Sequence, residues 1–162
     1  MKWVKQSIHY WCPDTKEHKF LGQNVTVAIL DTGISPHPDF KGRILSFRDF
    51  SSTTGSSEKV LFSFSHFSPL IDNSGHGTHV AGIAGGSGLL SSGTYAGIAP
   101  FCNLIIGKVL DQNGNGSIKN VINGIQWIRD IYTQFHIRII NISVGTRPDL
   151  SIHQKLLLLN AV

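Results

Sequence analysis

The chain has 162 residues, 41% of them hydrophobic, which fits one globular domain with a buried core. Its formal charge is +4, but the 14 lysines and arginines are scattered, which argues against a nucleic-acid-binding patch. Two cysteines are too few for a zinc cage built from cysteines, and no apolar run is long enough to span a membrane.

Residues 1–24 are polar, contain scattered aromatic side chains and are interrupted by Pro13 and Gly22. We expect them to form an N-terminal arm that lies on a domain comprising residues 25–162. The arm has no uninterrupted apolar stretch of the kind found in signal peptides, which favours a cytoplasmic protein, with secretion as the alternative.

Three apolar, β-branched segments predict strands that are covered on both faces: 25–30, 103–110 and 137–144. Between the last two, apolar residues recur at helical spacing over 117–132, with Ser117 as a plausible N-cap. This order of strand, helix and strand predicts a parallel sheet in an α/β fold. The Ser- and Phe-rich segment 51–70 reads as a long surface excursion.

Asp31 ends the first predicted strand and is followed at once by Thr-Gly. An Asp in this setting serves either as half of a carboxylate dyad or as the acid that orients a catalytic histidine. A dyad needs two such loops on an all-β scaffold, whereas this chain has one loop and alternates strands with helices. The α/β pattern therefore favours the orienting acid.

The stretch "DNSGHGTHVAGIAGG", residues 72–86, holds two histidines, His76 and His79, at the start of a predicted helix. A zinc hydrolase using both is one interpretation, but Gly77 stands where the general-base Glu of such enzymes would be. Gly75 and Gly77 leave room for backbone close to His76, as a proton-transferring imidazole requires. The pattern favours His76 as a general base and His79 as a structural residue.

Five segments closely resemble the N-terminal two thirds of the catalytic domain of subtilisin-like serine proteases, the subtilases or peptidase family S8. They are "ILDTGISPHPDF", "DNSGHGTHVAGIAGG", "YAGIAP", "KVLDQNGNGS" and "IINISVG". The resemblance is strongest to the intracellular bacterial branch. It implies a three-layer fold with a mostly parallel sheet, which would be incomplete at its C-terminal side in this chain.

The resemblance also implies residue roles in a serine endopeptidase that hydrolyses peptide bonds. Asp31 would be the triad acid and His76 the general base. Two segments would form opposite walls of a groove for a polypeptide substrate: Gly114, Asn115 and Gly116 on one side, and Ser143, Val144 and Gly145 on the other. No partner beyond the polypeptide substrate is expected, neither nucleic acid nor membrane.

The family's nucleophilic serine lies in a Gly-Thr-Ser type motif, and no Gly-Thr-Ser occurs in these 162 residues. An oxyanion-hole asparagine is not recognisable either. We therefore expect the chain alone to be inactive, as part of an enzyme, with a non-catalytic peptide-binding module as the alternative. No cofactor is expected. Asp39 matches a calcium ligand of the family, but the partner loop lacks acids and asparagine, so calcium is not expected there.

Overall fold

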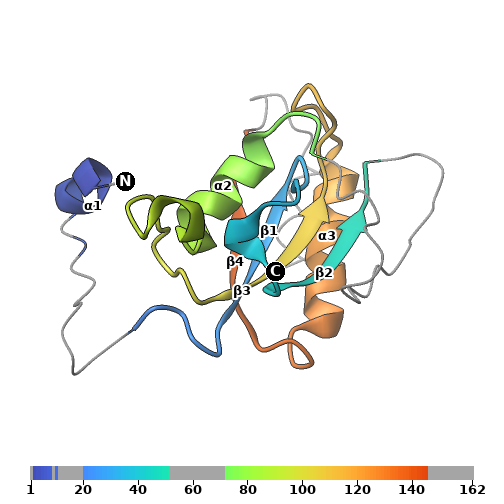
Figure 1. Ribbon diagram of the computed structural model, residues 1–162. Helices are drawn as coiled ribbons and strands as arrows, with labels where there is room; N and C mark the ends of the chain where they lie inside the picture. The colour runs from blue at the N-terminus through green and yellow to red at the C-terminus, as the bar shows by residue number, and fades with distance from the viewer. Residues whose placement is uncertain (1, 9, 11–19, 52–71, 146–162) are drawn as a thin grey trace.

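The centre of the fold is a parallel four-stranded sheet. A computed structural model describes residues 2–8, 10, 20–51 and 72–145. The strands lie in the order β2-β3-β1-β4 (Figure 1). Their bounds are β1 Thr26–Asp31, β2 Ile44–Asp49, β3 Asn103–Lys108 and β4 Ile137–Ile142. Because all pairs are parallel, the carboxyl ends of the strands meet at one edge of the sheet.

The two middle strands, β1 and β3, are buried over almost their whole length. All six residues of β1 and five of the six in β3 are buried, and Ile29 pairs in register with Ile106. Strands covered on both faces read as continuous apolar runs, and this confirms the strands predicted over 25–30 and 103–110.

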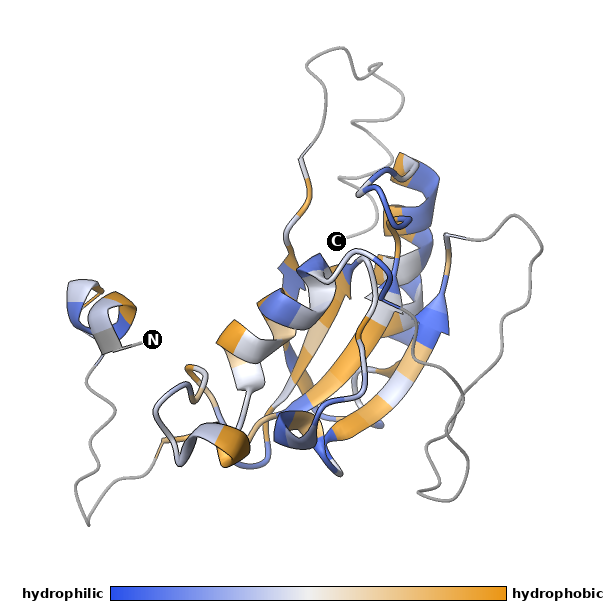
Figure 2. Cartoon of the chain, turned by 45° about the horizontal axis from the view of Figure 1, so that its top comes forward, coloured by the Kyte–Doolittle hydropathy of each residue, from blue (hydrophilic) through white to orange (hydrophobic). Residues whose placement is uncertain are grey.

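One helix covers each face of the sheet: α2 (His76–Gly85) and α3 (Ile118–Ile131). Alternate residues of β1 divide between two apolar clusters. Val27 and Ile29 pack in the cluster that contains Ala81 of α2, whereas Ala28 and Leu30 pack in the cluster built on α3. Figure 2 shows hydrophobic stretches along the strands that lie between the helices. The three-layer arrangement is the predicted α/β fold.

The helix expected over 117–132 is confirmed as α3. The Ser117 side chain accepts a hydrogen bond from the Asn120 amide (3.2 Å) and so caps the helix, as the sequence predicted. The buried face presents Val121, Ile125 and Ile128 to the sheet.

The edge strands differ from the sequence-based expectations. Strand β2 was not predicted, because only Phe47 of its six residues is buried and the segment lacks a continuous apolar run. Strand β4 was predicted to be covered on both faces, yet Ile139, Ile140 and Ile142 are 40–54% exposed. It lies at the opposite edge of the sheet, where β1 is its one neighbour among the described strands.

The N-terminal residues contain a short helix, α1 (Lys2–Ser7), and reach the loop that precedes β3. The Lys5 ammonium donates to the Gly97 carbonyl (2.9 Å), and the Tyr10 hydroxyl donates to the Ile98 carbonyl. The division at residue 25 stays a prediction, and the surface excursion expected at 51–70 lies almost wholly outside the described residues. In the described part of the chain, no helix has both the length and the apolar character to cross a membrane.

Candidate functional site

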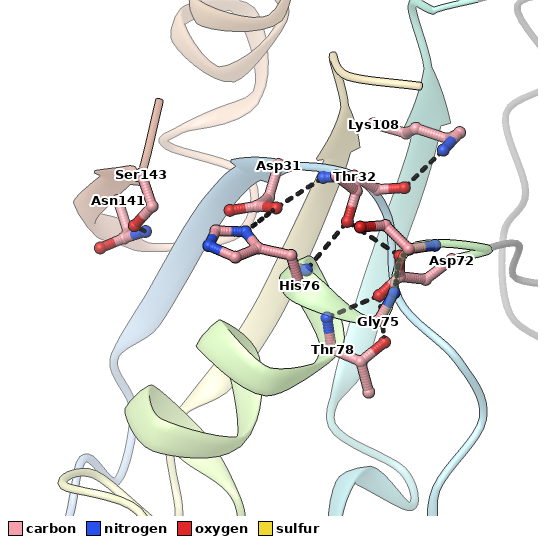
Figure 3. A network of polar contacts seen from close by, with 11 residues as sticks. Asp31, Thr32, Asp72, Gly75, His76, Thr78, Lys108, Asn141 and Ser143 are labelled. Carbon is pink, nitrogen blue, oxygen red and sulfur yellow. Dashed lines mark hydrogen bonds and ion pairs between the residues drawn. The ribbon is translucent and has the colours of Figure 1, made fainter. Parts of the chain in front are cut away.

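The structure brings Asp31 and His76 together at the carboxyl edge of the sheet. Asp31 is the last residue of β1 and is fully buried, while His76 is the first residue of α2. The His76 Nδ1 atom lies 2.7 Å from Asp31 Oδ1, which also accepts a hydrogen bond from the Thr32 amide at 2.7 Å (Figure 3). The His76 side chain remains 51% exposed, so its other ring nitrogen is accessible.

The Asp31 carboxylate changes the basicity of this imidazole. The pKa of His76 is raised above the ordinary value for histidine. The largest cause is the hydrogen bond that the Asp31 carboxylate accepts from the ring, and the second is the negative charge of Asp31. Partial desolvation acts in the opposite direction but is the weaker effect, and the charge of Asp72 adds a small increase. The pair therefore holds a hydrogen on Nδ1 and presents Nε2 as the proton acceptor.

Glycine at position 77 allows helix α2 to begin this close to β1. A Cβ atom at Gly77 would overlap the Gly33 carbonyl oxygen and lie 3.0 Å from the Gly33 nitrogen and 3.2 Å from Asp31 Cβ. The residue before His76, Gly75, is the helix N-cap with a φ of 83°, a conformation that favours glycine. Of the two glycines that flank His76, Gly77 serves close backbone approach as expected, whereas a Cβ at Gly75 would meet nothing within 4 Å and the positive φ is what favours glycine there.

Gly77→Ala is expected to lower the free energy of unfolding by about 3 kcal/mol, because backbone atoms of the loop after β1 must move to admit the methyl group. Gly82→Ala is the matched control in the same helix, since a Cβ there meets nothing within 4 Å. It should stabilise the protein by up to about 1 kcal/mol through helix propensity. Urea unfolding followed by circular dichroism measures both; equal effects of the two variants would contradict the tight contact.

Asp72 braces the start of α2 against the loop that follows Asp31, a role that the sequence analysis missed. Its carboxylate accepts hydrogen bonds from Thr32 Oγ1 (2.8 Å), the Gly75 amide (2.9 Å) and the Thr78 amide (2.8 Å). It also accepts from the Thr78 hydroxyl and the Ser74 amide (3.2 Å). Burial by itself would raise the pKa of Asp72, but these hydrogen bonds outweigh burial and lower it.

Thr32 completes this bracing on the side of β1. Its hydroxyl oxygen accepts a hydrogen bond from the Gly77 amide at 2.9 Å, and its carbonyl accepts from the buried Lys108 ammonium. Hydrogen bonds therefore connect Asp72, Thr32 and Gly77, and so link the residue that follows Asp31 to the residue that follows His76. An Asp followed by Asn, Ser and Gly before a helix is an Asx-turn signal that could have pointed to Asp72.

The predicted substrate-wall residues lie beyond β3 and β4. The backbone at Gly114–Gly116 is exposed and turns around Asp111, whose carboxylate accepts from the amides of Asn113 (2.8 Å) and Asn115 (2.9 Å). Gly114 has a φ of 75°. A Cβ at Gly116 would lie 2.5 Å from the Val109 carbonyl oxygen, so packing on the end of β3 already demands glycine there.

On the other side, Ser143 and Gly145 are exposed and Val144 is half-buried. In the sheet order, β3 and β4 are the two neighbours of β1. The segments after these strands therefore emerge on either side of Asp31, as two walls of a groove require. Their contact with substrate stays a prediction.

His79 does not join His76 in a metal site. It is exposed and lines a separate hollow of about 590 Å³ together with His37, Tyr95 and Ile83. Across the described residues, no group of three or more His, Cys, Asp or Glu side chains is placed to hold a metal ion. The geometry gives the zinc-hydrolase interpretation no support, since His76 Nδ1 is already paired with Asp31.

The surroundings of Asp39 do not suit calcium. Its carboxylate oxygens accept hydrogen bonds from the Gly88 amide (3.1 Å) and the Leu90 amide (3.3 Å) of the facing loop. A calcium ion needs several oxygen ligands, whereas this loop presents N–H donors to the carboxylate. Asp39, in the short 3₁₀ helix η1 (Pro38–Phe40), thus directly holds the loop that contains the 3₁₀ helix η2 (Leu89–Ser91).

Comparisons with known proteins find serine proteases among the relatives of this chain. The serine protease AprX of Bacillus subtilis is 46% identical over 106 residues, which cover 65% of this chain and 21% of AprX. The major intracellular serine protease of the same organism is 37% identical over 131 residues, 80% of this chain and 36% of that protein. Relatives also include the minor extracellular protease Epr of Bacillus subtilis, at 36% identity.

Solved structures show the same architecture. The Clostridium perfringens CspB protease matches with a TM-score of 0.74 at 24% identity, covering 90% of this chain and 34% of that one. Sphericase matches with a TM-score of 0.68 at 28% identity, covering 86% and 41%. This chain therefore spans between 17% and 45% of the length of these proteins and of a cold-adapted subtilisin-like serine proteinase. The sequence profile of the Subtilase family matches residues 22–157, and the chain belongs to that family.

Proposed function

We propose that this chain supplies the acid and the base of a serine-type endopeptidase, with Asp31 as the acid and His76 as the base. One observation carries the proposal: a buried carboxylate lies 2.7 Å from the Nδ1 atom of a histidine whose side chain is half exposed. A buried pair with one accessible ring nitrogen is the arrangement that activates a serine hydroxyl.

In this mechanism His76 Nε2 takes the proton from the serine hydroxyl as the oxygen attacks the peptide carbonyl carbon. His76 then carries the proton to the leaving amine nitrogen as the peptide C–N bond breaks. Asp31 remains ionised throughout and stabilises the imidazolium that forms between the two transfers. Water then releases the acyl group by the same sequence of proton transfers.

A polypeptide is the substrate class that the surroundings of the pair favour. The exposed backbone of Gly114–Gly116 follows β3, and that of Ser143–Gly145 follows β4, on either side of the acid. Exposed main chain of this kind binds an extended peptide by backbone hydrogen bonds. The cytoplasmic location stays a prediction, because the relatives include both an intracellular and an extracellular protease.

The nucleophile would come from outside these 162 residues, which contain no Gly-Thr-Ser sequence. We expect the purified 162-residue chain to release no product from a chromogenic peptide and to take up no fluorophosphonate probe. The reason is that loss of the nucleophile removes about a million-fold in rate, a value known for subtilisin, another subtilase.

The test compares that chain with the product of its whole natural gene. Hydrolysis by the gene product, blocked by phenylmethylsulfonyl fluoride, would support the endopeptidase. Inhibitor-sensitive hydrolysis by the 162-residue chain itself would mean that one of its own serines attacks. Peptide binding without hydrolysis by either protein would replace the proposal with a non-catalytic binding module.

A further inference from the structure

The second oxygen of the Asp31 carboxylate has no hydrogen-bond partner. Asp31 Oδ2 is fully buried, and no donor of the described residues reaches it, whereas Oδ1 accepts from both Thr32 and His76. Buried carboxylate oxygens are almost always hydrogen-bonded, because leaving one unpaired costs the full desolvation of that atom. The site therefore calls for one more donor beside Asp31.

The register of the sheet places a hydroxyl-bearing residue beside Asp31, on the chain that continues β4. Leu30 of β1 pairs with Ile142 of β4, so the next pair along the two parallel strands is Asp31 and Ser143. Register partners in a parallel sheet point to the same face. Figure 3 shows Asn141 and Ser143 on one side of Asp31, while Thr32 and Asp72 lie on its other side.

The Ser143 hydroxyl is oriented by its neighbour on the same face. Asn141 Nδ2 donates a hydrogen bond to Ser143 Oγ at 2.8 Å. This bond occupies a lone pair of the hydroxyl oxygen and leaves its hydrogen available to donate. Ser143 itself is exposed and follows directly after β4, the edge strand.

We propose that Ser143, oriented by Asn141, is a positioning residue whose hydroxyl donates to Asp31 Oδ2. This inference rests on the proposed function of the Asp31–His76 pair. With Oδ2 held by Ser143, the carboxylate cannot rotate away, and Oδ1 stays on His76 Nδ1. The hydroxyl also shares the negative charge of the carboxylate and so moderates its hold on the imidazolium. This role of the Ser143 hydroxyl is separate from the predicted role of Ser143 in the groove wall, which uses its main chain.

The test is the titration of His76 in the 162-residue chain, followed by NMR with labelled histidine and assigned from a His76→Gln spectrum. Ser143→Ala leaves a more basic carboxylate beside His76, so the pKa of His76 should rise by about half a unit. Ser143→Thr keeps the hydroxyl and should restore the original titration. Asn141→Leu should cause a smaller rise, and adding it to Ser143→Ala should cause no further change.

An unchanged or lowered pKa of His76 in Ser143→Ala would overturn the inference. So would a rise in Ser143→Ala that Ser143→Thr reproduces in full, because the hydroxyl would then be irrelevant. Asp31→Asn separates this failure from that of the proposed function. If Asp31→Asn lowers the pKa of His76 while Ser143→Ala does not move it, only the role of Ser143 fails. If Asp31→Asn has no effect, the Asp31–His76 pair itself fails.

Discussion

His76→Ala, introduced into the natural gene product, is expected to lower kcat for peptide hydrolysis by about a million-fold, the loss seen when subtilisin loses this group. The imidazole is the group that moves the proton, and among the described residues no other side chain is hydrogen-bonded to Asp31. KM should change little, because the half-exposed ring acts on the reacting atoms and leaves the groove walls intact.

His79→Ala is the matched control for this experiment. It removes the same side chain three residues later in the same helix, from an exposed position that lines a separate hollow. Its kcat should stay within about threefold of the unmodified protein, as for a surface substitution away from the reacting groups. Initial rates with a chromogenic peptide measure both variants. A loss below about tenfold in His76→Ala would remove His76 from the mechanism.

Asp31→Asn is expected to lower kcat by about ten thousand-fold, as the same change does in other Asp-His-Ser triads. An asparagine amide can donate to Nδ1, which leaves the hydrogen on Nε2, the atom that must accept the serine proton. The variant is nearly the same size as the original residue, and it replaces a buried charge by a neutral group. The fold should therefore persist while the tautomer is wrong.

The same substitution has a defined effect on pH dependence. The Asp31 carboxylate raises the pKa of His76, so its removal should return that pKa toward the ordinary range of histidine. The base must be neutral to act, so the acidic limb of the pH–rate profile should shift to lower pH, while the plateau falls. Asp130→Asn, an exposed carboxylate on α3, should change neither. A plateau of normal height in Asp31→Asn would contradict the tautomer argument.

Sequence patterns were sufficient for the parts of the fold whose environment is uniform. Both middle strands and α3 could be predicted from the sequence. Burial of a strand on both faces gives a continuous apolar run, and burial of one helical face gives apolar residues at helical spacing. At the edges of the sheet, β2 was missed, and β4 was predicted as a strand but with the wrong burial. Strand β2 has only Phe47 buried and shows no period, whereas β4 has a core-like sequence but is exposed at the edge of the described sheet.

The residues of the site also divide into those that the sequence predicted and those that it did not. Asp31 and His76 were named from the sequence, because a strand-ending acid and a glycine-flanked histidine carry their chemistry in the local motif. Asp72 and Thr32 were missed, since their value lies in contacts between segments 40 or more residues apart in the chain. A motif shows which group can react, and only contacts across the chain show what holds it in place.

The sequence by itself predicted the parallel α/β architecture, pointed to Asp31 and His76 as the candidate acid and base, and indicated the need for glycine around His76. Tertiary structure alone decided the 2.7 Å contact between Asp31 and His76, the bracing by Asp72 and the unpaired second oxygen that faces β4. The physical reason is that periodicity and turn chemistry are properties of neighbouring residues. The hydrogen bonds of the Asp31 and Asp72 carboxylates include partners 40 or more residues away in the chain, which only the folded chain brings together.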